Sequence, residues 1–224
     1  EEQTVVALTH FGYIKRMPID TYRSQRRGGK GITGIATREE DFVKQIFTAS
    51  THDTILFFTN KGKLYKLRGY EVPEAGRTAR GTAIVNLLSL DAGEKVSAVI
   101  PIQNFAEGKY LLMATKNGLI KKTALTEYNS SRTTGLQGIT LKDDDELITV
   151  RLTDGEDNVV LVTREGMCIT FDEKDVRPIG RVAQGVIGIR LSDEDEVIGM
   201  ESVIAGGKAT LLAITENGFG KRTE

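Results

Sequence analysis

The chain has 224 residues, of which 39% are hydrophobic, and its 30 Lys and Arg residues nearly balance 31 Asp and Glu residues. This composition supports a substantial core, and the net charge of −1 argues against a uniformly basic nucleic-acid-binding chain. No apolar run is long enough to span a membrane. Residue 1 is acidic and already leads into a predicted strand, so we expect no signal peptide. The single cysteine, Cys168, excludes an intramolecular disulfide framework, so we expect it to be a buried thiol in a reducing compartment.

The first predicted element is the apolar run 4–9, which leads to a turn glycine, Gly12. The same arrangement recurs in the runs 54–59, 110–115, 159–163 and 210–215, which lead to Gly62, Gly118, Gly166 and Gly218. We call these five residues the anchor glycines. Glycine after Asn or Lys between two apolar runs is a hairpin signal, because glycine adopts positive φ without strain. Each run is therefore predicted to be a strand that turns into a second strand.

A second glycine follows each of the first four anchors after 19 or 20 residues, at Gly31, Gly81, Gly138 and Gly185. An acidic turn and another alternating run come next, at 41–47, 95–102, 146–152 and 196–203. The segment 38–47 taken alone has helical spacing, with Phe42, Val43, Ile46 and Phe47 on one face. Its register against the other copies predicts a strand instead.

The chain thus contains four copies of one unit and a truncated fifth, at 4–50, 53–104, 109–155, 157–206 and 208–224. A period near 50 residues with four strand-like runs per copy is typical of propeller blades. We predict an all-β fold in which residues 1–224 form a single domain of four-stranded antiparallel blades. Because one hairpin cannot bury its own apolar face, neighbouring copies must share a core.

Positive charges recur at equivalent places in these copies. One set follows the anchor glycines, and the other precedes the second glycine. The first set is Lys15, Arg16, Lys63, Lys66, Lys121, Lys122, Lys221 and Arg222, and the second includes Arg77, Arg80, Arg132 and Arg181. We expect them to form a basic belt on one rim, with the acidic turns on another edge. Such a belt can bind a polyanion although the net charge is close to zero.

Residues 25–31 concentrate both features in the heptapeptide Gln25, Arg26, Arg27, Gly28, Gly29, Lys30 and Gly31. Glycine exposes backbone N–H groups, and arginine and lysine bind phosphate oxygens. This combination suits a polyanionic backbone, and duplex DNA is the obvious candidate. A low aromatic content of 6% disfavours a base-stacking platform for single strands.

Catalytic and metal-binding patterns are absent from the sequence. His10 and His52 are the only histidines, and with a single cysteine they make no metal site. The segment 28–31 lacks the Lys-Ser/Thr pair of a nucleotide-binding loop. We therefore expect no catalytic residue, metal or cofactor in this domain.

The heptapeptide matches the gyrase box, and the chain resembles the C-terminal domain of the DNA gyrase A subunit over its whole length. The segments 74–81, 84–88, 118–123 and 218–223 share this resemblance. It implies a six-bladed β-pinwheel, in which blades exchange a strand or hairpin with their neighbours. About four and a third copies are visible here.

The resemblance also implies non-sequence-specific binding of double-stranded DNA and a right-handed wrap around a basic rim. It implies a bacterial, cytoplasmic and nucleoid-associated heterotetramer, in which the rest of the gyrase A subunit, together with the gyrase B subunit, provides the ATP- and Mg2+-dependent supercoiling chemistry. Three alternatives stay open: the C-terminal domain of topoisomerase IV, a propeller that serves as a protein-interaction scaffold, and a propeller enzyme with an axial site. The intact box favours gyrase over topoisomerase IV.

Overall fold

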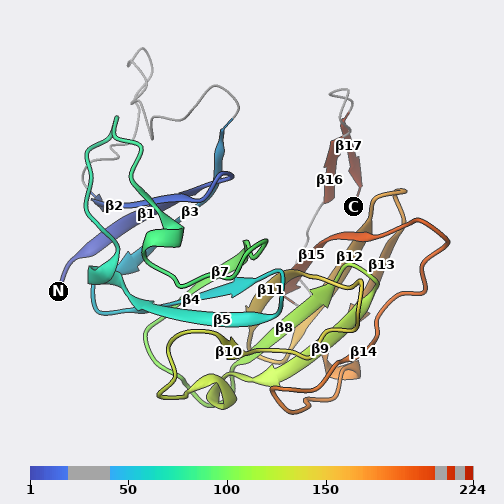
Figure 1. The fold of residues 1–224 in the computed structure, drawn as a ribbon. Coiled ribbons are helices and arrows are strands. Elements are labelled where there is room, and N and C mark those ends of the chain that lie inside the picture. Colours follow the sequence, from blue (N-terminus) through green and yellow to red (C-terminus); the bar gives the residue numbers. More distant parts are fainter. Residues whose placement is uncertain (20–40, 205–210, 215–219, 224) are drawn as a thin grey trace.

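The computed structural model describes residues 1–19, 41–204, 211–214 and 220–223, which form β-strands joined by turns and short 3-10 helices (Figure 1). The strands are β1 (Gln3–Thr9), β2 (Tyr13–Pro18), β3 (Val43–Ser50), β4 (Thr54–Thr59), β5 (Lys63–Arg68), β6 (Thr82–Ala83), β7 (Val96–Ile102), β8 (Tyr110–Thr115), β9 (Leu119–Ala124), β10 (Leu136–Gln137), β11 (Leu147–Thr153), β12 (Asp157–Thr163), β13 (Cys168–Asp172), β14 (Val186–Ile187), β15 (Val197–Ile204), β16 (Leu211–Ile214) and β17 (Gly220–Thr223). The 3-10 helices are η2 (Gly69–Glu71), η3 (Ile84–Asn86), η4 (Leu125–Tyr128) and η5 (Glu173–Asp175). None of the helices in this part of the chain has the length and apolar character needed to cross a bilayer.

The strands form separate antiparallel sheets that correspond to the sequence copies. Their orders are β3-β1-β2-β6 in sheet A, β10-β5-β4-β7 in sheet B, β11-β8-β9-β14 in sheet C and β13-β12-β15 in sheet D, and β16 pairs with β17. In sheets A to C, three strands come from one copy and the fourth comes from the following copy. The short strands β6, β10 and β14 are these exchanged strands, which pair with β2, β5 and β9. The predicted all-β pinwheel with strand exchange is therefore confirmed.

Three apolar clusters lie between successive sheets, so the sheets stack face to face. Val6 and Phe57 belong to the cluster between sheets A and B, Phe58 and Met113 to the one between B and C, and Leu112 and Leu161 to the one between C and D. A central strand with sheets on both faces is buried on both sides, which favours a largely apolar run. All six residues of β4 are accordingly buried.

The four sheets follow one another along an open arc in chain order (Figure 1). Strand β11 lies beside both β7 and β15, so these edge strands face the inside of the arc. The opposite edges of sheets A to C carry the exchanged strands β6, β10 and β14. These exchanged strands therefore mark the outer edge of the domain.

The glycine turns follow the prediction except in the third copy. The anchors Gly12, Gly62, Gly118 and Gly166 all have positive φ, between 76° and 92°. The second glycines Gly81 and Gly185 directly precede the exchanged strands, with φ of 92° and 97°. In the third copy this place belongs to Gly135, with φ of 66°, because Leu136 pairs with Leu64.

Gly138, which spacing had selected, lies three residues farther along and donates its N–H to Gly62 O at 2.8 Å. Its structural equivalents are Ile84 and Gly188, whose N–H groups are donated to Gly12 O and Gly118 O. In the third copy the connection between the anchor glycine and the exchanged strand is shorter than in the second and fourth copies. The constant spacing therefore predicted Gly138, which is the second glycine of a Gly-x-x-Gly pair.

Two further expectations concern single segments. Residues 43–50 form β3, which confirms a strand for the described part of 38–47. Cys168 is exposed, so the expectation of a buried thiol is wrong. It lies on β13, which is an edge strand among the described residues and has no exchanged strand beside it.

Candidate nucleic-acid interface

The chain of each later copy runs along the second strand of the preceding copy before it enters the exchanged strand. We call these stretches, 72–81, 128–135 and 176–185, the crossing segments. Backbone bonds hold them to the preceding copy: Arg16 N–H donates to Pro73 O at 3.0 Å, and Lys66 N–H donates to Thr133 O at 2.8 Å. In the third case Ile179 N–H donates to Lys122 O at 2.8 Å. The crossing segments thus lie at the outer edge of the arc.

Three predicted cations are exposed on these segments. Arg77, Arg80 and Arg132 all face solvent, and the Arg80 guanidinium lies 5.3 Å from the ring centre of Tyr13. Arg181 is half-buried, and its side chain donates to the backbone oxygen of Gln137. The outer edge therefore carries arginines that can reach a ligand in solution.

Two lysines of β5 lie beside these arginines. Lys63 forms an ion pair with Asp91 at 2.8 Å, and that carboxylate raises the Lys63 pKa. The Lys66 ammonium donates to Tyr128 O at 2.6 Å, and burial, together with the positive charge of Arg181, lowers its pKa. Both residues are half-buried and already have protein partners.

The solvent-facing belt does not include every predicted cation. Lys15 and Lys121 are 0% exposed and Lys122 is 5% exposed, so these three side chains face the protein interior. Arg16 is half-buried, with its Nε donating to Val72 O at 2.9 Å. Successive side chains on a strand point to opposite faces, and consecutive residues of β2 and of β9 are buried, so a lysine on either face is enclosed by protein.

The remaining predicted residues have no described side chains. The heptapeptide 25–31 lies outside the described residues. Lys221 and Arg222 lie on β17, where only the backbone pairing with β16 is described. Their proposed contacts with DNA stay predictions from the sequence.

Recurring aspartates were missed as structural residues. Asp41 Oδ1 accepts N–H bonds from Phe11 and Phe42, each at 2.9 Å. Burial alone would raise the pKa of Asp41, but these N–H donors lower it below its usual value. Asp145 and Asp195 accept equivalent pairs of backbone N–H groups. An Asp before the last strand of each of these copies was the available signal, and it was interpreted only as displaced charge.

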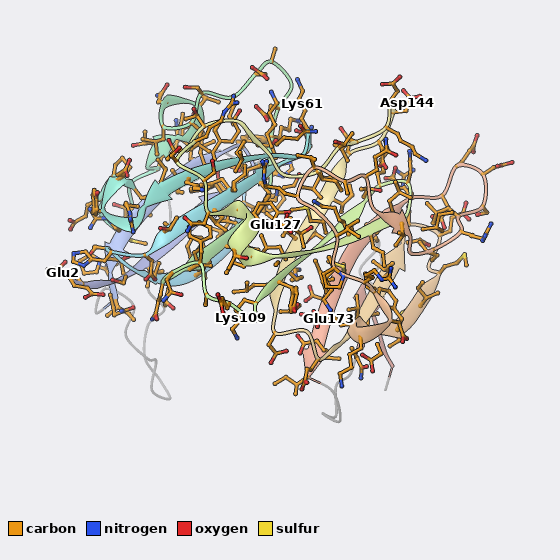
Figure 2. All side chains as sticks on the ribbon, turned by 90° about the horizontal axis from the view of Figure 1, so that it is seen from below. Glu2, Lys61, Lys109, Glu127, Asp144 and Glu173 are labelled. Atoms are coloured by element: carbon orange, nitrogen blue, oxygen red, sulfur yellow. The ribbon has the colours of Figure 1, made fainter. Side chains whose placement is uncertain are left out.

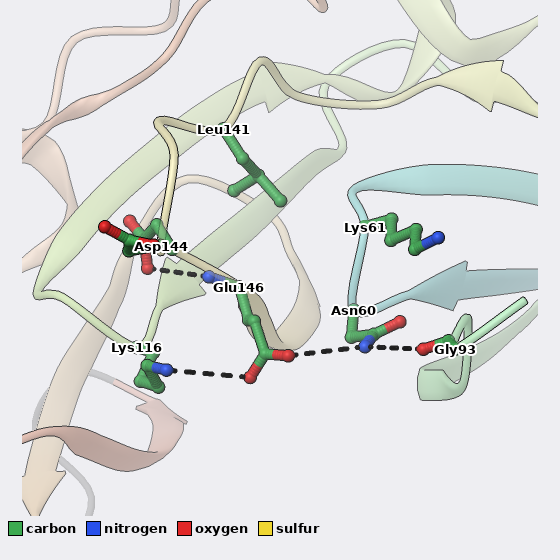
Figure 3. Close-up of a pocket in the computed structure, with 8 residues that line it drawn as sticks. Asn60, Lys61, Gly93, Lys116, Leu141, Asp144 and Glu146 are labelled. Carbon is green, nitrogen blue, oxygen red and sulfur yellow. Dashed lines mark hydrogen bonds and ion pairs between the residues drawn. The ribbon is translucent and has the colours of Figure 1, made fainter.

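The acidic turns lie at the end of the blades where the anchor turns are. Figure 2 shows Lys61 and Asp144 at one end of the sheets and Lys109 and Glu173 at the other. In a shallow pocket at the first end, Glu146 pairs with Lys116 at 3.9 Å and accepts from Asn60 at 3.4 Å (Figure 3). Since Asp144, Asp145 and Glu146 all line it, this pocket is a poor site for a polyanion.

One acidic trio among the described residues has metal-like spacing. Ligand oxygens of Asp154, Asp157 and Glu173 lie within 4.8 Å of one another. Burial raises the Asp157 pKa, and the two neighbouring carboxylates raise it further. Buried Glu173 already accepts from the Thr153 hydroxyl and from Asp157 N–H, and Lys122 lies 3.9 Å away. Protein donors thus occupy this trio, and it gives no independent sign of a metal.

The comparisons with known proteins agree with this architecture. The sequence matches the family model described as "DNA gyrase C-terminal domain, beta-propeller" over residues 3–50, 53–103, 109–154, 157–204 and 209–224. It is 56% identical over 188 residues, or 84% of the chain, to the DNA gyrase A subunit of Clostridium acetobutylicum. That alignment covers 23% of the relative, so the chain spans about a quarter of its length.

Two solved structures share the fold over 99% of the chain. One is the C-terminal domain of DNA topoisomerase IV, with a TM-score of 0.82, 32% identity and 67% of that chain covered. The other is a DNA gyrase A C-terminal domain, with a TM-score of 0.75, 29% identity and 71% of that chain covered. With five matched repeats, four stacked blades and this identity to a gyrase A subunit, the chain belongs to the DNA gyrase C-terminal domain family.

Proposed function

We propose that this domain binds duplex DNA along its outer edge without reading base sequence, and bends it into a right-handed wrap. The supporting observation is that Arg77, Arg80 and Arg132 are exposed on equivalent crossing segments of successive blades. Arginine contacts to phosphate position a duplex but specify no sequence. A row of such contacts along an arc is suited to a curved duplex.

The wrap has to offset the stiffness of DNA. Bending about 60 base pairs through a half-turn costs roughly 7 kcal/mol for a rod with a persistence length of ~150 base pairs. Many phosphate contacts along the edge would offset this cost. On this proposal the box at 25–31 fastens one end of the wrap and sets the hand of the DNA crossing.

The proposal extends to the enzyme that contains the domain. The domain itself is non-catalytic and works with the rest of the gyrase A subunit, and with the gyrase B subunit, in a bacterial, nucleoid-associated type II topoisomerase. ATP and Mg2+ act in those other parts. The wrap would let the enzyme introduce negative supercoils, where an unwrapped enzyme would only relax DNA.

The test compares two charge-matched double variants in a salt titration of duplex binding. R77A/R80A removes two exposed arginines of a crossing segment, whereas R151A/R164A removes two arginines that pair with Glu201 and Glu196 away from that edge. Wild-type log K should fall with log salt with a slope near −5 if about six phosphates are neutralised. R77A/R80A should shallow that slope by about 1.8, and R151A/R164A should leave it unchanged. Equal effects of the two variants, or a strong preference for one DNA sequence, would contradict the proposal.

A second candidate is the C-terminal domain of topoisomerase IV, favoured by the TM-score of 0.82 to such a domain. The linking-number change of bound DNA tests the right-handed wrap that the gyrase assignment requires. A small circle bound to the domain, relaxed by an unrelated topoisomerase and then deproteinised, should keep a positive linking difference if the wrap is right-handed. A gel shift that shows no binding to long duplexes would instead favour a protein-interaction scaffold.

A further inference from the structure

Lys15 is fully buried and holds a crossing segment of the next copy. Its ammonium donates to the backbone oxygens of Gly76, Arg77 and Ala79 at 2.8, 2.8 and 3.0 Å. An ammonium has three N–H donors, so all of them are used within the protein. None is left for a phosphate.

Lys121 occupies the equivalent position, three residues after its anchor glycine, and does the same in another pair of copies. It is also fully buried, and its ammonium donates to Gly138 O at 2.7 Å, to Arg181 O and to the Tyr128 hydroxyl at 3.3 Å. Gly138 belongs to the same copy, whereas Arg181 belongs to the next crossing segment. Two instances of the same arrangement in one chain make an incidental contact an inadequate explanation.

The middle pair of copies uses a neighbouring residue for the same purpose. Tyr65 stands at the position of Lys15 and Lys121, and its hydroxyl bonds to Glu94 at 2.8 Å instead. The following residue, Lys66, donates to the backbone oxygens of Tyr128 and Ser130 at 2.6 and 2.9 Å. In each described junction, a lysine amine therefore holds the backbone of a crossing segment.

Two of the residues held in this way are arginines of the crossing segments. Arg77 offers its backbone oxygen to Lys15 while its side chain is exposed, and Arg181 offers its backbone oxygen to Lys121. Several carbonyls aimed at one point repel one another unless a donor stands between them. A segment fixed before binding also loses less conformational entropy when a ligand arrives.

We propose that Lys15 and Lys121 are positioning residues of the DNA-binding edge: each holds a crossing segment through its backbone oxygens so that the segment's arginines face the duplex. This inference rests on the proposed function. It separates the basic residues of the sequence into those that contact DNA and those that place the contacting residues.

The test is a double-mutant cycle read by DNA affinity. Lys15→Met, which keeps the length and removes the donors, should weaken duplex binding by roughly three- to tenfold, the cost of a lost hydrogen bond or two. In the R77A/R80A background the same change should have an effect within about twofold, because the residues that it positions are gone. The matched control Lys95→Met removes an exposed lysine and should leave the affinity within about twofold. If Lys15→Met weakens binding equally in both backgrounds and shallows the salt slope by about 0.9, Lys15 contacts phosphate and the proposal is wrong.

Two further measurements do not depend on DNA affinity, and the second of them uses only the wild-type domain. In hydrogen exchange, the amides of Ala75 and Ala79 should lose protection in Lys15→Met and keep it in Lys95→Met. In the wild-type domain, limited lysine acetylation read by mass spectrometry should spare Lys15 and Lys121 both with and without DNA. Modification in the free domain that DNA then suppresses would overturn the proposal. A wild-type domain that binds no duplex refutes the proposed function together with this role, whereas binding that is indifferent to Lys15→Met refutes the positioning role alone.

Discussion

The exchanged strand β14 can be tested by comparing two glycine substitutions in one copy. Gly185 has φ of 97° and Gly166 has φ of 89°, so alanine at either position incurs the cost of positive φ, about 1–2 kcal/mol. Their surroundings differ. A Cβ on Gly185 would lie 2.5 Å from Ile120 O, whereas a Cβ on Gly166 would meet nothing within 4 Å.

A contact of 2.5 Å with a backbone oxygen cannot be relieved by rotating a side chain, so β14 must move away from β9. The register Val186↔Ile120 and Ile187↔Leu119 would then be disrupted. Each lost hydrogen bond contributes about 0.5–1.5 kcal/mol. We expect Gly185→Ala to lower the free energy of unfolding by about 2–4 kcal/mol, against about 1–2 kcal/mol for Gly166→Ala.

Urea unfolding followed by circular dichroism measures both values. The two variants should share the slope of the wild type if the unfolded state is unchanged. The reasoning fails if Gly185→Ala is no less stable than Gly166→Ala, because the steric contact would then have no energetic consequence. It also fails if Gly185→Ala is as stable as the wild type, since β14 would tolerate displacement.

Three other predictions concern the box and two single residues. Replacing Arg26, Arg27 and Lys30 by alanine in the full enzyme should abolish supercoiling and leave DNA relaxation and cleavage intact. It should also shallow the salt slope of DNA binding by about 2.7. A triple variant that still imposes the full wrap would show that the box is one more basic patch. Burial lowers the pKa of Lys121 to about 7. Between about pH 7 and 9.5 the unfolded chain therefore holds a proton that the folded chain has released. The free energy of unfolding should rise with pH over this range, by up to about 1.4 kcal/mol per pH unit. Urea titrations should show this rise in the wild type and not in Lys121→Met; parallel pH profiles would contradict it. Because Cys168 is exposed, it should react with a thiol reagent as fast in the native domain as in urea. The Cys168→Ser variant serves as the blank. Slow labelling that becomes faster on unfolding would mean that β13 is covered.

Features that depend on local chemistry could be predicted from the order of residues alone. Anchor turns such as Gly12 follow from the need for positive φ, and central strands such as β4 follow from a continuous apolar run between two covering sheets. The repeat also predicted the strand β3 correctly, although the apolar spacing of that segment alone is helical. The family followed from motifs that repeat along the whole chain.

Which cations are available to a ligand depends on packing between segments that are far apart in the chain. Lys15 and Arg77 look alike in the sequence, since both are basic residues near a turn glycine, yet Lys15 is 0% exposed and Arg77 faces solvent. The exposure of Cys168 and the choice of Gly135 over Gly138 were settled in the same way, by strands paired across copies. The oxygens that enclose the Lys15 ammonium come from residues 61 to 64 positions away, on a segment exchanged from the next blade. Burial depends on what packs against a side chain, and no local pattern around Lys15 contains that information.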